Sequence, residues 1–363
     1  MSGRGGAVTI EGATPFGGPA MRKTTRETGP VFVGLDYHTE SVQVCVLDRG
    51  GQVLFNQACG NDWRAVRDAV ARFGTDVRAA IEACSGAADL AEELVTRAGW
   101  LVDLAHPGYV ARMKGNPDKT DFSDARMLAD LERVGYLPKV WHAPAEVREL
   151  RWLVRYRQQL VGERRNVKLR IGALLRDNRV VAPDGINPWT VAWVSWLTRD
   201  AALSEQTRWV IDQHLVRLRS LAVDIKAAEE RLARVTADDT LVGQLLELKG
   251  IGLVTAAMIR AEIGRFDRFR TGKQAARFCG LTPRNASSGQ RQADAGLIKA
   301  GNPQLRATLI ETAHRLVRYD TRWKKLATDM KSRGKAGSLV AAAVANRWVR
   351  WLFHPMQPAR LAV

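Results

Sequence analysis

The sequence predicts two kinds of structure in one chain, an α/β domain followed by an all-α region. Between residues 31 and 105, short apolar runs, some with period-two alternation, are interleaved with helical stretches. From about Pro144 the apolar residues recur at helical spacing instead. The chain has 363 residues, which is enough for two or three domains with cores of their own.

The α/β part begins with three short strands, the second and third of which are separated by a tight turn at Asp48–Gly51. In order, the expected elements are strands at 31–35, 42–46 and 53–55, a helix at 63–73, a strand at 77–81, a helix at 87–97 and a strand at 100–104. Three antiparallel strands followed by helix, strand, helix and strand is the order of an RNase H-like (RuvC-like) domain. We therefore expect this fold for residues 31–140.

The remaining segments are defined by composition and spacing. Residues 1–30 are rich in Gly, Thr and Pro and are expected to be a disordered lead, with Met21 as an alternative start. Residues 141–240 are expected to form long helices, and the heptad-like spacing from Leu203 to Val235 predicts an antiparallel helical pair or coiled coil. This pair either packs within the chain or forms a dimerisation arm that touches nucleic acid. Residues 241–363 are expected to be a basic helical domain.

Charge separates the two parts of the chain. The net charge is +17, from 55 Lys and Arg against 38 Asp and Glu. Residues 31–140 hold 12 basic and 16 acidic side chains, whereas residues 268–363 hold 19 basic and 4 acidic ones. A basic segment of this kind favours a polyanionic partner, and nucleic acid is favoured over anionic lipid because no amphipathic anchor with a bulky apolar face is present.

Several classes are excluded by what the sequence lacks. No window approaches the roughly 18 uninterrupted apolar residues of a membrane span, and the N-terminus has no signal-peptide pattern. The four cysteines show no paired spacing, so neither a disulfide framework nor a zinc site is expected. We expect a cytoplasmic protein that is not associated with a membrane.

Four carboxylates are candidates for a metal site. Asp36 and Glu82 lie at the ends of the first and fourth strands, which are neighbours in an RNase H-like sheet. Asp121 and Asp124 are spaced i and i+3 where a helix begins, so both can lie on one helix face. Taken singly, each has a structural explanation as a cap or a turn former. Together they predict a site for Mg²⁺, which prefers oxygen ligands and can polarise a phosphodiester.

A Gly-Ile-Gly turn between two apolar helical segments is a second candidate. Lys249, Gly250 and Gly252 lie in this turn. Glycines let the backbone approach a phosphate, and the amides that open the next helix can donate to it, as in a helix-hairpin-helix element. The alternative is an ordinary glycine-capped helix corner.

A Ser-Ser-Gly loop in a basic setting is the third candidate. Ser288 is followed by Gly289, and the sequence around it carries four cations and an asparagine: Arg284, Arg291, Lys299, Arg306 and Asn302. The cations can hold a phosphate and its developing charge, and a serine hydroxyl there can attack phosphorus and retain the strand covalently. On composition alone, such a loop is a turn.

Together these motifs resemble the DEDD transposases of the bacterial insertion-sequence family one-ten, relatives of the Piv invertase. The likeness runs from about Val31 to at least Val317. It rests on Gly-Leu-Asp36, Ile-Glu82-Ala, Lys-Thr-Asp121-x-x-Asp124-Ala-Arg-Met-Leu-Ala, Lys-Gly-Ile-Gly, Gly-Leu-Thr-Pro-x-x-x-x-Ser288-Gly and Lys-Ala-Gly-Asn-x-x-Leu-Arg.

The resemblance implies a RuvC-like domain whose four acids bind Mg²⁺ and a helical transposase domain whose nucleophile is Ser288, with the adjacent Ser287 as an alternative. It also implies a composite site between protomers of a dimer that pairs into a tetramer. A structured bridge RNA would pair with donor and target DNA. Two rival functions are a RuvC-like Holliday-junction nuclease that uses metal-activated water and a noncatalytic scaffold that binds nucleic acid.

Overall fold

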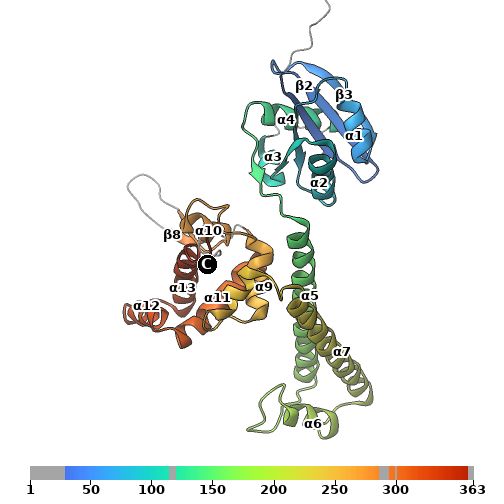
Figure 1. Ribbon diagram of the computed structural model, residues 1–363. Helices are drawn as coiled ribbons and strands as arrows, with labels where there is room; N and C mark the ends of the chain where they lie inside the picture. The colour runs from blue at the N-terminus through green and yellow to red at the C-terminus, as the bar shows by residue number, and fades with distance from the viewer. Residues whose placement is uncertain (1–28, 114–119, 286–293, 299–300, 359–363) are drawn as a thin grey trace, which may run out of the picture. The chain divides into compact units, whose positions relative to one another are not determined.

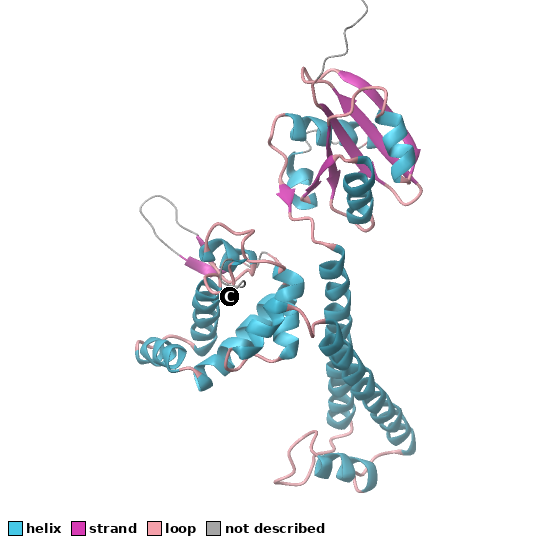
Figure 2. Cartoon of the chain, viewed as in Figure 1, coloured by secondary structure: helices cyan, strands magenta, loops and turns pink. Residues whose placement is uncertain are grey.

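A computed structural model describes residues 29–113, 120–285, 294–298 and 301–358. The chain divides into two compact units, with the boundary between His142 and Ala143. Figure 2 shows the strands gathered in the first unit, whereas the second is helical apart from one hairpin. The predicted change from α/β to helical structure is therefore confirmed. A further division of the helical part near residue 240 stays a prediction.

The first unit is built on a sheet of six strands in the order β3-β2-β1-β4-β5-β6. The strands are β1 (Val31–Tyr37), β2 (Ser41–Leu47), β3 (Val53–Gly60), β4 (Val77–Glu82), β5 (Leu101–Ala105) and β6 (Lys139–Val140). The β1–β2 and β2–β3 pairs are antiparallel, whereas β4 runs parallel to both β1 and β5. The five predicted strands are all present, and this mixed sheet is consistent with an RNase H-like domain.

Helices cover both faces of this sheet (Figure 1). They are α1 (Trp63–Val70), α2 (Ala87–Ala98), α3 (Pro107–Met113) and α4 (Asp121–Arg133). Because side chains alternate along a strand, Val33 and Leu35 of β1 pack on one face with α1 and α2. Phe32 packs on the other face with α4.

Gly34 lets α4 approach the sheet closely. A Cβ atom at this position would lie 1.8 Å from the carbonyl oxygen of Ala125 and 2.6 Å from the amide nitrogen of Ala129. Both atoms belong to the backbone of α4, so neither can turn away as a flexible side chain would. Only glycine fits, and the backbone contact fixes α4 against β1.

The second unit begins with two long helices, and a short helix lies between them in the sequence. The helices are α5 (Ala145–Asp177), α6 (Val191–Arg199) and α7 (Glu205–Val235). Arg157 of α5 is paired with Glu229 of α7, and Glu163 with Arg217. The residue numbers rise on one helix as they fall on the other, so α5 and α7 are antiparallel, as predicted. Their shared core also includes Trp193 of α6, which was not predicted.

The described part of the second unit continues with further helices and a hairpin. They are α8 (Thr240–Glu247), α9 (Leu253–Ile263), α10 (Gly272–Phe278), α11 (Pro303–Tyr319), α12 (Thr321–Ser332) and α13 (Gly337–Leu352), with strands β7 (Pro283–Asn285) and β8 (Asp294–Leu297). Their core is continuous and includes Met258, Phe266 and Trp348. Among the described helices, none has the length and apolar character needed to cross a bilayer.

Candidate functional site

The predicted acids of the sheet lie at the ends of two adjacent parallel strands. Leu35 of β1 is level with Ile81 of β4, and each strand continues into an acidic residue, Asp36 and Glu82. The Asp36 side chain is largely buried, with 16% of its surface exposed. The parallel register thus brings both acids to the same edge of the sheet, as the sequence predicted.

The other two acids lie in the first turn of α4, one turn apart. The helix begins with a capping box in which the Thr120 hydroxyl oxygen accepts a hydrogen bond from the backbone N–H of Ser123, and the Ser123 hydroxyl oxygen accepts one from the backbone N–H of Thr120. Asp121 is exposed, whereas Asp124 is buried with 6% of its surface accessible. The side-chain amide of Asn56 on β3 donates to the carbonyl of Phe122 at 3.0 Å, which anchors this turn to the sheet. The turn that carries the acids is therefore held by its cap and by β3.

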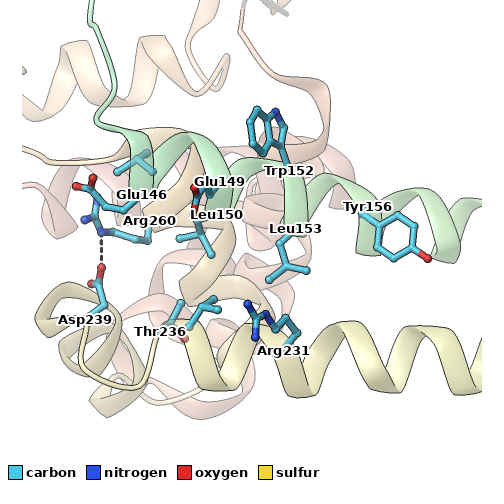
Figure 3. A pocket seen from close by; sticks show the side chains of 12 residues that line it. Glu146, Glu149, Leu150, Trp152, Leu153, Tyr156, Arg231, Thr236, Asp239 and Arg260 are labelled. Atoms are coloured by element: carbon cyan, nitrogen blue, oxygen red, sulfur yellow. Dashed lines mark hydrogen bonds and ion pairs between the residues drawn. The ribbon is translucent and has the colours of Figure 1, made fainter. Parts of the chain in front are cut away.

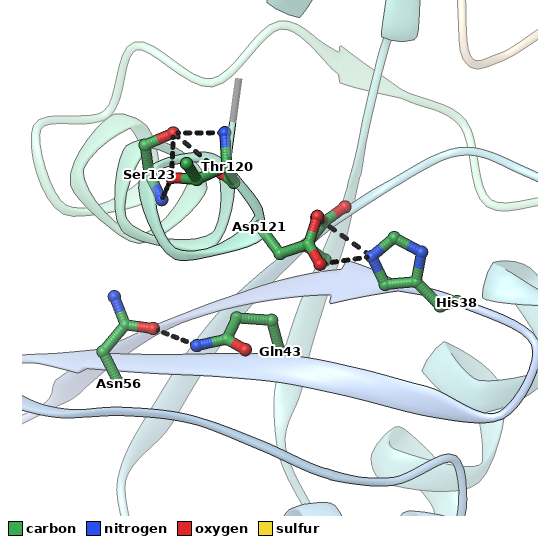
Figure 4. Close-up of polar contacts among 7 residues, drawn as sticks. His38, Gln43, Asn56, Thr120, Asp121 and Ser123 are labelled. Carbon is green, nitrogen blue, oxygen red and sulfur yellow. Dashed lines mark hydrogen bonds and ion pairs between the residues drawn. The ribbon is translucent and has the colours of Figure 1, made fainter. Parts of the chain in front are cut away.

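A histidine joins the acids of the two elements. Nε2 of His38 lies 3.4 Å from Oδ2 of Asp36 and 3.4 Å from Oδ2 of Asp121 (Figure 4). One donor atom from each of the three side chains lies within 4.8 Å of the others, and no other trio of His, Cys, Asp or Glu among the described residues meets this criterion. The structure therefore brings Asp36 and Asp121 together, while Glu82 and Asp124 lie outside this trio.

The pKa of the Cys84 thiol is affected by the negative charges of nearby carboxylates. Burial raises the pKa of this thiol above its usual 9.0, and the Ala87 backbone N–H partly offsets the rise. The charges of Glu82 and Asp36 raise the pKa further. Both carboxylates therefore act on one thiol, which is consistent with a shared acidic edge.

His38 was missed by the sequence analysis, although a signal for it exists. It follows Asp36 by two residues, and this spacing puts side chains on the same face of an extended chain. A lone histidine after a strand is common, so the spacing alone did not single it out.

The predicted serine site is only partly described. Ser288, its neighbour Ser287, Arg291 and Lys299 lie outside the described residues. Ser288 comes between β7 and β8 in sequence, and Asn285 pairs with Asp294 at the hairpin's described end. This hairpin was not predicted, because its two strands are only three and four residues long.

Three other predicted residues surround that hairpin in sequence. Arg284 is an exposed residue of β7. Asn302 caps α11, and its side-chain oxygen accepts hydrogen bonds from the amides of Gln304 and Leu305. Arg306 lies in the first turn of α11 and is half-buried. The Asn302 oxygen is thus already used within the helix, and only Arg284 is fully accessible to a partner.

The Gly-Ile-Gly turn joins α8 to α9, and its two glycines differ. Gly250 has a φ of +84°, which favours glycine, and its carbonyl accepts a hydrogen bond from Arg315 of α11. Gly252 is exposed, has no neighbour where a Cβ would lie and caps α9 without a side-chain hydrogen bond. Lys249 is exposed beside it. One side of the turn is therefore packed on α11, whereas the side with Lys249 and Gly252 is open.

A basic groove between α10 and α13 was not predicted. We use this name for two adjoining hollows that share Lys273 and Arg350. The exposed cations that line it are Arg270, Lys273, Arg277, Arg347 and Arg350. None of the five forms an ion pair with another described residue, and no carboxylate lines either hollow. The cations come from segments 70 residues or more apart in sequence, so no local motif indicates the groove.

A separate cavity of about 500 Å³ lies in the second unit beside the start of α5 and the end of α7 (Figure 3). Glu146, Glu149 and Trp152 line one side. Asp239 accepts from Nε of Arg260 at 2.6 Å and also caps α8. None of the predicted site residues lines this cavity, and the Asp239–Arg260 pair serves the packing of α8 and α9.

The fold and the two kinds of surface define a class of protein. It combines an α/β domain that has carboxylates at its strand ends with a basic helical unit, as enzymes that cut or join nucleic acids do. Comparison with known proteins identifies the family within this class. One family model, described as a transposase and named DEDD_Tnp_IS110, matches residues 33–178, and a second, described as the transposase IS116/IS110/IS902 family, matches residues 243–328.

Two known proteins are similar in sequence to this chain over most of its length. A protein described as a probable family 20 transposase from Pseudomonas aeruginosa is 29% identical over 331 residues, which cover 88% of this chain and 95% of the relative. The transposase for insertion sequence element IS1111A from Coxiella burnetii is 26% identical over 331 residues, 88% of each chain. The chain belongs to the IS116/IS110/IS902 family of transposases.

Proposed function

We propose that this transposase exchanges DNA strands through a phosphoserine intermediate with the help of a divalent cation. The observation that carries the proposal is the meeting of Asp36, at the end of β1, with Asp121, in the first turn of α4. Residues 31–140 are the catalytic RuvC-like domain in this proposal, residues 141–240 pair protomers and contact nucleic acid, and residues 241–363 carry the nucleophile.

The carboxylates suit a hard divalent cation, for which Mg²⁺ is the expected ion. Asp36 and Asp121 offer carboxylate oxygens that lie together, and Glu82 and Asp124 are the two further acids of the proposed set. Carboxylate oxygens are the ligands that Mg²⁺ prefers. A bound cation would polarise the scissile phosphate and stabilise the charge that develops on it. The role of the chain is to hold four negative groups near one point, which the anchored first turn of α4 supports.

The covalent step belongs to Ser288. Its oxygen attacks phosphorus, a serine–phosphate ester bond forms, and the bond from phosphorus to one sugar oxygen breaks. The serine proton leaves to a base, and the released sugar oxygen takes up a proton. The reverse attack by a sugar hydroxyl of another strand joins that strand and frees the serine, so no external energy source is required. Arg284, Arg291, Lys299 and Arg306 would neutralise the phosphate.

The remaining features of the proposal concern partners. Lys249, Gly250, Gly252 and Asn302 would bind nucleic-acid backbones, and the basic groove extends the surface available for this. Choice of sequence would be delegated to a bridge RNA that pairs with donor and target DNA. This part rests on the family resemblance and on the lack of a recognised base-reading motif in the sequence. A dimer that pairs into a tetramer would assemble acids and serine from different protomers.

The test is a recombination assay on supercoiled plasmids with the matching guide RNA. We expect Ser288→Ala and Asp36→Ala each to reduce product by a factor of about 1,000 or more, because each removes an essential chemical group. Wild-type reactions stopped with detergent should contain DNA strands attached covalently to the protein, and Ser288→Ala should contain none. Ser287→Ala decides between the adjacent serines.

Asp184→Ala is the matched control, because Asp184 is an exposed carboxylate in a loop of the second unit. Cleaved DNA with no protein attached would indicate metal-activated water, as in a junction nuclease. A wild-type protein that binds RNA and DNA but neither cleaves nor joins strands would indicate a noncatalytic scaffold. Either result would overturn the proposal.

A further inference from the structure

We propose that His38 is a direct ligand in the acidic site and raises the affinity of this site for first-row transition ions, such as Mn²⁺ and Co²⁺, more than its affinity for Mg²⁺. The inference rests on the proposed function in one respect, because it concerns the ion held by Asp36 and Asp121. It adds a nitrogen donor to a ligand set that otherwise offers oxygen alone.

The donor atoms are spaced as ligands of one ion. Nε2 of His38 is 3.4 Å from an oxygen of Asp36 and 3.4 Å from an oxygen of Asp121. Two ligands about 2.1 Å from a shared ion lie about 3.0 Å apart at a right angle and about 3.4 Å apart at the tetrahedral angle. Both measured separations are close to these values, so small movements of the side chains would bring them to the spacing that a six-coordinate ion requires. The imidazole therefore stands where a third ligand would stand, and little rearrangement is required to admit an ion.

The backbone holds the imidazole in this place. The amide of His38 donates to the carbonyl of Ser41 at 2.9 Å, which closes the turn between β1 and β2. The His38 carbonyl accepts a hydrogen bond from the side chain of Asn61 at 2.9 Å. Because both backbone groups are used, the side chain leaves a fixed turn and is directed at the two carboxylates. The side chain is 45% exposed, so solvent reaches it.

A nitrogen ligand changes which ions bind well. Mg²⁺ favours six oxygen ligands in near-octahedral geometry and retains several waters. Imidazole nitrogen suits transition ions, whose affinities for a mixed nitrogen and oxygen set rise along the series from Mn²⁺ to Cu²⁺. An imidazole beside two carboxylates therefore raises the affinity for transition ions, while the carboxylates still accept Mg²⁺.

The test measures ion binding by the full-length protein, independently of recombination. Titrations with Mg²⁺, Mn²⁺ or Co²⁺ alone compare the wild type with His38→Ala and His38→Gln. We expect His38→Ala to lower the affinity for Co²⁺ and Mn²⁺ by at least about tenfold and to change that for Mg²⁺ by less than about threefold. His38→Gln, which offers an amide oxygen, should retain Mg²⁺ binding and lose the added affinity for transition ions.

Pulsed electron paramagnetic resonance of bound Mn²⁺ gives the direct readout. The wild-type spectrum should show coupling to an imidazole nitrogen, and the spectrum of His38→Ala should lack it. His314→Ala is the matched control, because His314 is an exposed histidine of α11 in the second unit. This variant should bind all three ions as the wild type does.

The outcomes separate the inference from the proposed function. If Co²⁺ and Mg²⁺ affinities fall together in both His38 variants, or if neither changes, the ligand role of His38 is wrong although the acidic site stands. If the wild type binds no divalent ion, the metal site and the inference both fail. Loss of binding in Asp36→Asn, with the His38 pattern as expected, supports both.

Discussion

The two compact units of this transposase differ in how they place their charged groups. In the first unit the candidate acids lie at strand ends and in a capped helix turn, where sheet register and backbone hydrogen bonds fix them. In the second unit the cations project from helix surfaces, and the basic groove forms only where α10 and α13 meet.

This contrast matches the different tasks proposed for the two units. Ligands of a metal ion must be held within a few tenths of an ångström, which requires a rigid sheet edge. Phosphate backbones are bound through long-range charge, which tolerates the freedom of exposed arginine and lysine side chains. The following predictions test whether the first unit depends on exact placement of its side chains and the second unit on its positive charge.

The largest effect is expected from Gly34→Ala. The new methyl group would collide with the backbone of α4 at Ala125, so α4 must move away from β1 and take Asp121 with it. We expect the first unit to lose about 3 kcal/mol or more of unfolding free energy, measured by urea denaturation. Gly60→Ala is the control, because no atom lies within 4 Å of a Cβ there. Equal stability of the two variants would contradict the close packing of α4.

A smaller effect is expected from neutralising the basic groove. The triple variant Lys273→Gln, Arg277→Gln and Arg350→Gln removes three exposed cations. The slope of log affinity against log salt concentration for duplex DNA or structured RNA should fall by about one for each phosphate that is no longer neutralised, so by about three. Unfolding free energy should change little, because the side chains are exposed.

The matched control replaces Lys324, Lys325 and Lys331, which are exposed on α12, with Gln. It removes the same charge from another surface of the same unit. If both triple variants reduce the slope equally, net charge alone attracts the nucleic acid, and the groove is not a specific binding surface.

The smallest effect concerns the Cys84 thiol. Its pKa is raised by burial and by the charges of Glu82 and Asp36, so at pH 8 it holds less thiolate than an ordinary cysteine. Asp36→Asn removes one charge and should lower this pKa. The rate of alkylation of Cys84 at pH 8 without divalent ions, followed by mass spectrometry of the peptide, should rise about two- to fivefold. An unchanged rate, equal to that of Asp184→Asn, would show that Asp36 does not act on this edge.

Much of the fold was predictable because burial leaves a periodic trace in sequence. The five longer strands and helices α1, α2 and α4 of the first unit were predicted from the sequence, whereas α3 was not, and the antiparallel α5–α7 pair follows from its Leu and Val repeat. Short elements left no such trace. The two residues of β6 and the strands of the β7–β8 hairpin are too brief for any period to appear.

The acids were predictable individually, whereas their relation to His38 and the basic groove were not. Asp36 and Glu82 could be assigned to one edge because parallel strands share a direction. The contact from His38 to Asp121 depends on how the α4 turn is anchored by Asn56, which is a tertiary interaction. The groove depends on the crossing of two distant helices. The spacing of His38 from Asp36 indicates neither its contact with Asp121 nor the groove.

The pairing of Asn285 with Asp294 has a consequence for how the family can diversify. The residues between these two positions, Ser288 among them, are joined to the described structure at one pair of the antiparallel register. A change in their number need not shift β7 against β8, and the entropy of loop closure rises only slowly with length. Relatives can therefore differ in the length of this segment without altering the two strands that flank it.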